Sequence, residues 1–299
     1  MPDVIDKTYL PFTPEQLRSH FTNDVAGQID YYQKSAARYH EFMGSHTETT
    51  GIPLTKARYP RQIEKDERFW TVTALKHIFD DPARNALFSK LLTETYGPTP
   101  PLSGMESWDD CLSGDLKLYF EAQLAPPPAD VSWLRKNIAD RQMIPYVLDA
   151  SQRNSSLRLE GATHVDAILV NVSNGFSWLI EAKVLSDVSY SISFDHYRNQ
   201  IARNVDVMLH NSSQPGSALE NRDPENSVFS LLTPGSFKQY PSSRLYGWLM
   251  KEYTTNPDAL KRDLSHREGM DWNALSRRIG WLTFEDFERM RPGTCPWLP

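Results

Sequence analysis

Cysteine is scarce in this sequence. Its 299 residues include only Cys111 and Cys295, which lie far apart and outside any metal-ligand or redox spacing. This excludes a disulfide framework and a zinc ribbon, so a reducing cytoplasmic location is expected. Long apolar runs are missing as well, since none approaches the roughly 20 residues that span a bilayer. The N-terminal MPDVIDKTYLPF lacks the form of a signal peptide, and we expect no membrane contact.

Positive charge is also in deficit. The formal net charge of −6 argues against a protein that coats nucleic acid through bulk basic charge, although it leaves room for a focal basic groove. The phosphate-binding patterns GxxxxGKS/T and GxGxxG are both absent. Neither an NTPase nor a dinucleotide-binding role is therefore indicated.

The first hundred residues have helical patterning. Thr13 is a capping residue followed by proline, and helical spacing continues from it to residue 43. Further helices are predicted over residues 61–79 and from Asp81 to the residues before Tyr96. These stretches predict a helical N-terminal region, residues 1–100.

Helices are predicted on both sides of the central segment. One begins at Ser107 or Asp115 and ends at Leu124, before three consecutive prolines. Another covers residues 133–150. Beyond residue 240 the predicted helices span residues 242–253, 258–264, 271–279 and 283–290, the last with a capping-box pattern at Thr283 and Asp286. Residues 241–299 are therefore expected to form a helical C-terminal extension, which leaves residues 101–240 as the core.

The hydrophobic period changes from 3.6 to 2 in the second half of that core. Strands are predicted over residues 156–160, in two runs between residues 163 and 185, and over residues 188–194 and 228–232. A helix before the last strand is expected to begin at Asp195 and to end near His210, with Gln200 and Asn204 on one flank. The order of strands and helices predicts an α/β fold.

An Asn-Gly pair, Asn174-Gly175, connects the two runs between residues 163 and 185. Such a pair between alternating hydrophobic runs favours a hairpin with a two-residue loop. That loop would place Asp166 opposite Lys183, with Glu181 one diagonal step away, so that two carboxylates and an ammonium converge on one patch. Charges in a sheet covered by helices are costly unless they are paired or bind a metal. The hairpin is therefore the candidate functional site.

The spacing of these charges supplies a family resemblance. Asp166 is followed, after fourteen residues, by Glu181-Ala182-Lys183, and the next predicted helix carries Gln200. This pattern resembles the PD-(D/E)XK nuclease superfamily, which includes restriction-endonuclease-like and RecB-like domains, although valine stands before Asp166 where the family name has proline. The resemblance covers about residues 107–235. It implies a restriction-endonuclease-like αβββαβ core, a mixed central sheet flanked by helices, here with helical N- and C-terminal extensions.

The resemblance also implies a role for each hairpin residue. Asp166, Glu181 and the backbone carbonyl of Ala182 would bind one or two Mg²⁺ ions, for which Mn²⁺ can substitute. Lys183 would position or help deprotonate the attacking water and would balance negative charge in the transition state.

Residues outside the hairpin would complete the implied site. Gln200, and behind it Arg203, match the helix position that steadies the site or contacts the phosphate. Many members also carry an acidic residue on the first core helix. Glu121 is the preferred candidate because it lies on a patterned helix, and Glu106 and the strand residue Glu160 are the alternatives.

The sequence thus predicts a metal-dependent nuclease that hydrolyses phosphodiester bonds, with DNA as the expected substrate and bacterial genome defence or DNA processing as the implied context. The alternatives are an RNA-directed nuclease and a nucleic-acid-binding or interaction module that keeps the fold without catalysis. A plainer interpretation makes Asp166 and Lys183 a cross-strand ion pair worth at most about 1 kcal/mol. Ile168 and Val170, which share the face of Asp166, argue against such a solvated pair. The helical ends are candidates for a homodimer or protein-partner contact.

Overall fold

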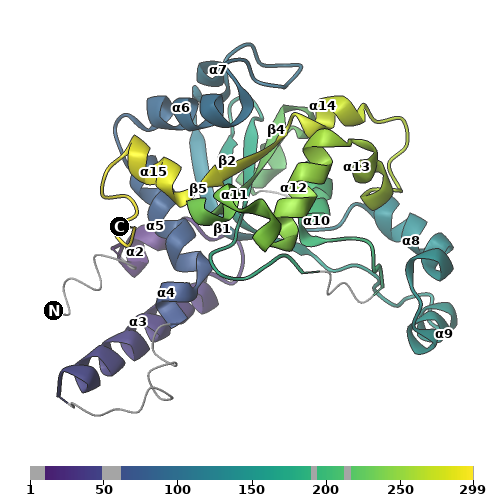
Figure 1. Ribbon diagram of the computed structural model, residues 1–299, viewed down its shortest axis with the longest axis horizontal. Helices are drawn as coiled ribbons and strands as arrows, with labels where there is room; N and C mark the ends of the chain where they lie inside the picture. The colour runs from purple at the N-terminus through teal and green to yellow at the C-terminus, as the bar shows by residue number, and fades with distance from the viewer. Residues whose placement is uncertain (1–10, 49–61, 190–193, 212–216, 299) are drawn as a thin grey trace.

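The chain folds around a mixed sheet of five strands in the order β1-β2-β3-β4-β5 (Figure 1). The strands are β1 (Leu116–Leu124), β2 (Thr163–Asn171), β3 (Ser177–Ala182), β4 (Ser227–Thr233) and β5 (Ile279–Thr283). The first three pair antiparallel, whereas β3, β4 and β5 are parallel to one another. The computed structural model describes residues 11–48, 62–189, 194–211 and 217–298. The predicted α/β fold with a mixed central sheet is confirmed.

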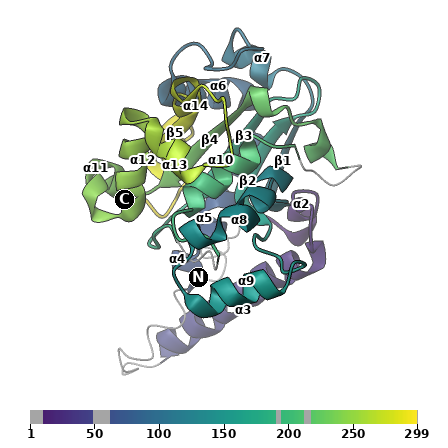
Figure 2. The same ribbon diagram turned by 90° about the vertical axis from the view of Figure 1, so that its right-hand side faces the viewer.

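Helices cover both faces of this sheet (Figures 1 and 2). One face packs against α5 (Glu67–Phe79), α6 (Arg84–Tyr96), α7 (Trp108–Leu112) and α15 (Phe284–Met290). The other packs against α10 (Gln200–Met208), α12 (Leu245–Thr255), α13 (Asp258–Asp263) and α14 (Trp272–Ser276). The remaining α-helices are α2 (Pro14–Arg18), α3 (Val25–Glu48), α4 (Gln62–Lys65), α8 (Pro128–Arg141), α9 (Pro145–Arg153) and α11 (Gly235–Gln239). No described helix is both long and apolar enough to cross a membrane.

The central strands β3 and β4 are buried along their whole length. Their polar side chains are paired: Trp178 Nε1 donates to Ser230 Oγ at 2.9 Å, and the hydroxyls of Ser177 and Ser227 are 2.6 Å apart. Helices on both faces remove such strands from water, so a charged side chain on β3 lies in a low-dielectric environment. Glu181, which is 0% exposed, is in that position.

Strand β1 occupies the segment for which a helix ending at Leu124 was predicted, and that prediction is wrong. The sequence LKLYFEAQL alternates with period 2, and every second residue from Leu116 to Leu124 is buried. Pairing with β2 buries Leu116, Leu118 and Phe120 on the side of α5 and α6, and Ala122 and Leu124 on the side of α10. Glu121 interrupts the strand with a φ of +51°, which is rare for a residue other than glycine. Glu121 therefore lies on an irregular strand and not on a helix.

The hairpin between β2 and β3 forms, but with a longer loop than predicted. Asn171 N donates to Phe176 O at 2.8 Å and Gly175 N donates to Asn171 O at 2.9 Å, which leaves four residues in the loop. Gly175 has a positive φ but Asn174 does not, so the type I′ turn expected of Asn-Gly is not formed. The last pair of the ladder is Ala167 with Ile180, and the predicted pairing of Asp166 with Lys183 is wrong by two residues. An error of two keeps every side chain on its predicted face.

Three other predictions in this region need correction. Residues 156–160 form no strand, and neither do Val188, Ser189 and Phe194, while residues 190–193 lie outside the described part. The helix predicted from Asp195 begins five residues later, because the side chain of Asn199 accepts from Ala202 N and caps α10. Gln200 is consequently the first residue of that helix.

Both ends of the chain join the core. One hydrophobic cluster includes side chains from Phe12 to Cys295, so the boundaries placed at residues 100 and 240 do not separate independent cores among the described residues. Residues 241–299, for which only helices were predicted, also supply β5. The capping box at Thr283 and Asp286 is confirmed at the start of α15. The N-terminal helix α5 packs across β1, β2 and β3, which brings its first residues to the predicted site.

Candidate active site

Three carboxylates lie side by side on the three antiparallel strands. The pairs Phe120–Ala167 and Ala122–Val165 bracket Glu121 opposite Asp166 on β2. One step beyond the last pair of the next ladder, Asp166 faces Glu181 on β3. The ladders of β1 and β3 with β2 both omit Asp166, which marks the point where regular pairing stops. The sequence therefore builds a row of acids across β1, β2 and β3, with Asp166 in the middle.

Glu181 is held in place from three sides. The amide nitrogen of Gln200 donates to Oε1, and that of Asn204 donates to Oε2 at 2.9 Å. Lys183 Nζ lies 2.5 Å from Oε1. Gln200 and Asn204 are one turn apart on α10, which packs against β2 and β3 in Figure 2. The predicted site residues Glu181, Lys183 and Gln200 are thus brought together, and Asn204 joins them.

Asp166 and Ala182 are linked through the backbone. Ala182 N donates to Asp166 Oδ2 at 2.7 Å, so this carboxylate partly replaces the missing strand pair. The Ala182 carbonyl accepts from Lys183 Nζ at 2.9 Å. Asp166, Ala182 and Lys183 therefore share one small region at the end of β3, where the spacing of the sequence predicted a site.

Glu67 also reaches this region, although no sequence pattern indicated it. Glu67 Oε1 lies 3.3 Å from Lys183 Nζ, and Oε2 accepts from Ser186 Oγ at 2.8 Å. Glu67 is the first residue of α5, directly after the capping residue Asp66. Acidic residues are common at helix N-termini for electrostatic reasons alone. Its sequence position therefore carries no distinguishing signal, and only the packing of α5 on the sheet reveals its partner.

The other acidic candidates have different positions. Glu106 is exposed before α7, and its neighbour Gly104 lies against Asn226 at the start of β4. The start of β4 and the end of the parallel strand β3 lie at opposite ends of the sheet. Glu160 is buried in an ion pair of 2.6 Å with Arg203. Neither Glu106 nor Glu160 joins Glu181, and Arg203 is engaged with Glu160 and with the carbonyls of residues 161 and 162.

A cleft opens over the row of acids. Its volume is about 360 Å³, and it is lined by Lys65, Asp66, Glu67, Arg68, Glu121, Asp166 and Ser186. With Glu181 beneath, the region contains five carboxylates and the three basic side chains of Lys65, Arg68 and Lys183. The carboxylate of Glu121 makes no hydrogen bond or ion pair with any residue in the described ranges. Negative charge is therefore in excess at the floor of the cleft.

Burial and crowding raise the pKa values of these acids. Burial, reinforced by Glu181, holds the pKa of Asp166 well above its usual range. Burial also raises the pKa of Glu181, and it raises that of Glu121 to about 7, with neighbouring carboxylates adding to the effect on Glu121. Burial opposes the charge of Lys183, but Glu181, Asp166 and Glu67 outweigh it and raise the pKa of the ammonium. Lys183 is therefore a cation throughout the physiological range.

These residues fit a hard divalent cation. All the donors are oxygens, which Mg²⁺ and Mn²⁺ prefer, and the excess negative charge is what such an ion would neutralise. The carboxylate of Glu121 is available as a ligand, and Asp166 uses only Oδ2 in its bond to Ala182. Asp166, Glu181 and Glu121 or Glu67 are the residues that would hold the ion.

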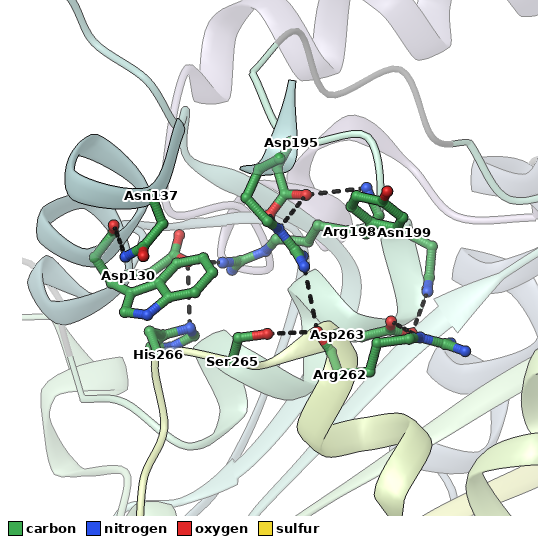
Figure 3. Close-up of polar contacts among 12 residues, drawn as sticks. Asp130, Asn137, Asp195, Arg198, Asn199, Arg262, Asp263, Ser265 and His266 are labelled. Atoms are coloured by element: carbon green, nitrogen blue, oxygen red, sulfur yellow. Dashed lines mark hydrogen bonds and ion pairs between the residues drawn. The ribbon is translucent and has the colours of Figure 1, made fainter. Parts of the chain in front are cut away.

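A second charged group contains Asp130 of α8, Asp206 of α10 and His266, and Figure 3 labels Asp130, Arg198 and His266. Ligand atoms of Asp130, Asp206 and His266 fall within 4.8 Å of one another, which no three acids of the cleft achieve. Basic side chains already occupy this group: Arg198 pairs with both aspartates, and Arg267 lies 2.6 Å from Asp206. These cations oppose a metal ion there. Arg198 is 1% exposed and belongs to this group.

Comparison with known proteins does not assign this chain to a family. No protein-family model, no curated protein and no solved structure matches this chain. The chemistry of the site therefore rests on its own geometry.

Proposed function

We propose that this protein is a metal-dependent nuclease of the PD-(D/E)XK type that hydrolyses phosphodiester bonds, most readily those of DNA. The supporting observation is the row of Glu121, Asp166 and Glu181 beside the buried ammonium of Lys183, at the floor of one cleft. The order of β1, β2, β3, α10 and β4 is compatible with the αβββαβ core of that family. Helices α8 and α9 are inserted between β1 and β2. A role in genome defence or DNA processing in the cytoplasm belongs to the same proposal.

Each residue has a task that follows from its contacts. Gln200 and Asn204 fix both oxygens of Glu181, so that this carboxylate presents one orientation to the cleft. When bound, Mg²⁺ or Mn²⁺ would polarise the phosphate and lower the pKa of a bound water. Lys183 carries its proton, so its charge would stabilise negative charge that develops on the phosphate, and a hydrogen bond to water or phosphate would replace its longest contact, that with Glu67. The raised pKa of Lys183 in the absence of a cation supports electrostatic stabilisation as its role in this proposal.

Cleavage assays with different cations test the proposal. Plasmid, linear duplex DNA, single-stranded DNA and RNA are each incubated with the purified chain in Mg²⁺, Mn²⁺, Ca²⁺ or EDTA. We expect strand cleavage with Mg²⁺ or Mn²⁺ and none in EDTA. Binding without cleavage under every condition would favour a nucleic-acid-binding module on the same fold, and cleavage confined to RNA would favour the RNA-directed alternative.

Substitution of Glu67 tests a site residue that only the structure indicates, because Glu67 is not part of the sequence pattern. Glu67→Gln is expected to reduce cleavage about 10- to 100-fold, because the neutral amide weakens both cation binding and the anchoring of Lys183. Glu106→Gln is the matched control, since Glu106 is exposed at the other end of the sheet. Initial rates of both variants are compared at saturating Mg²⁺ and at limiting Mg²⁺. Equal rates for the two variants would remove Glu67 from the site.

A further inference from the structure

Arg68 lines the cleft without contacting Glu181 or Lys183. It is the second residue of α5, and its side chain is 30% exposed. Its Nε lies 3.2 Å from Asp66 Oδ1 and its Nη2 lies 3.4 Å from Asp66 Oδ2. The other terminal nitrogen, Nη1, has no partner within the ranges that the structure describes. The guanidinium of Arg68 therefore lines the acidic cleft and has N–H groups free to donate hydrogen bonds.

Tyr31 and Asp66 fix the orientation of this guanidinium. The guanidinium carbon lies 3.7 Å from the centroid of the Tyr31 ring, and the Tyr31 hydroxyl donates to Asp66 Oδ2. Asp66 Oδ1 also caps α5 by accepting from Arg68 N at 3.1 Å. A guanidinium held by a flat ring and a capped helix loses little conformational entropy when it binds a ligand. Because Asp66 occupies the edge formed by Nε and Nη2, the edge that carries Nη1 remains for two oxygens of a tetrahedral phosphate.

The positive charge of Arg68 changes the pKa of an acid in the row. Its guanidinium is the largest electrostatic influence that lowers the pKa of Glu121, and Glu121 in turn favours the charged form of Arg68. Arg68 lines the same cleft as Glu121, which is one end of the acidic row, whereas Lys183 contacts Glu181 at the other end. The cleft offers one cation at each end of the proposed metal site.

We propose that Arg68 binds a phosphate of the nucleic-acid backbone next to the phosphate that is cleaved, with Tyr31 and Asp66 as positioning residues. This inference rests on the proposed nuclease function, because it concerns the same cleft. A strand crossing the row of acids from Lys183 toward Arg68 would place the attacked phosphate near Lys183 and its neighbour near Arg68. The net charge of −6 makes such a focal contact necessary, since bulk charge does not attract the strand.

A scan of neutral phosphates tests this contact directly. Fluorescein-labelled oligonucleotides carry one methylphosphonate at each backbone position in turn, and their affinities are measured by anisotropy in Ca²⁺ for the full chain. Replacing the contacted phosphate should weaken binding to the unsubstituted protein about 10- to 100-fold, as expected for a charged hydrogen bond. Arg68→Ala should bind the unmodified strand more weakly by a similar factor and should no longer respond to the substitution at that position.

Control variants distinguish binding from folding. Arg84→Ala is the matched control, because Arg84 also stacks on an aromatic ring, that of Phe79 at 4.9 Å, but lines a different cavity. It should keep the full response to every methylphosphonate. Tyr31→Phe loses the hydroxyl that holds Asp66 and should show a partial loss. Arg68→Lys retains the charge and tests folding, because it should melt like the unsubstituted protein while binding more weakly.

The outcomes separate this inference from the proposed function. If Arg68→Ala still responds to a methylphosphonate at every position that affects the unsubstituted protein, Arg68 touches no phosphate and the inference fails. Anisotropy in Ca²⁺ requires no turnover, so an absence of cleavage with a normal phosphate scan overturns only the nuclease proposal. A chain that binds no oligonucleotide at all overturns both.

Discussion

Lys183→Met is expected to reduce cleavage by about 10²- to 10⁴-fold, the range for loss of a positioned charge or proton donor in an active site. Lys183 is 3% exposed, and its ammonium contacts Glu181, Glu67 and the Ala182 carbonyl. No other cation contacts Glu181 among the residues described. Its removal therefore leaves Glu181 without a neighbouring cationic side chain and takes one positive charge away from the transition state. Initial rates at saturating Mg²⁺ provide the measurement.

Folding must be monitored in the same experiment. Removing one partner of a buried ion pair can cost about 3–5 kcal/mol, so thermal melts accompany each rate measurement. Lys183→Arg keeps the charge and should remain folded. Lys90→Met serves as the surface control, because Lys90 is exposed on α6. A folded Lys183→Met protein that cleaves within tenfold of the unsubstituted rate would refute the role assigned to this residue.

Asp166→Asn is expected to abolish detectable cleavage and yet to stabilise the chain when no divalent cation is present. The asparagine carbonyl can still accept from Ala182 N, but the charge at the centre of the acidic row is gone. Loss of a central metal ligand removes the cation from the position where the phosphate must react. We expect at least a roughly 10³-fold loss of activity, in the upper range for electrostatic contributions to catalysis.

The stability effect of Asp166→Asn should depend on pH. The pKa of Asp166 is raised in the folded state, so the folded protein binds this proton more tightly than the unfolded chain does. Stability therefore falls as the pH rises from about 4, the unfolded pKa of aspartate, toward and through the raised folded value. In EDTA, the melting temperature of the variant should exceed that of the unsubstituted protein by more at pH 8 than at pH 5.

Divalent cations should reverse this order. Mn²⁺ should raise the melting temperature of the unsubstituted protein at pH 8, where the carboxylates ionise on binding, and should have little effect on Asp166→Asn. Asp109→Asn, an exposed residue of α7, controls for the change of side chain. Stabilisation by Mn²⁺ that survives in Asp166→Asn would show that Asp166 does not hold the cation.

Local sequence patterns were sufficient to bring Asp166, Glu181 and Lys183 together. Residues two apart on a strand share a face, and the four-residue loop that contains Asn174 and Gly175 turns the chain back so that the two strands pair. The loop is four residues long and not two, but a register error of two preserves the face of every side chain. Gln200 and Asn204 also lie on one flank of the helix, as their spacing predicted, although α10 begins later than predicted.

The sequence of β1, which was predicted to be a helix, does contain a strand pattern. Its sequence alternates with period 2, yet its residues are also acceptable in a helix, and the prolines that follow it end either element. Pairing with β2 decides between the two, because an antiparallel neighbour satisfies the backbone groups of β1 and buries one row of its side chains. The same pairing places Glu121, whose φ is positive, opposite Asp166. No property of residues 116–124 alone predicts this position.

The sequence by itself determined the chemistry of the hairpin at the centre of the fold: which charges it carries and which face they share. Only the tertiary structure decided what completes the site. Glu67 and Arg68 reach the cleft because α5 packs across β1, β2 and β3, and Arg203 turns to Glu160 because α10 begins at Gln200. Periodicity reports short-range geometry, whereas contacts between residues more than a hundred positions apart depend on how apolar faces of separate elements pack together.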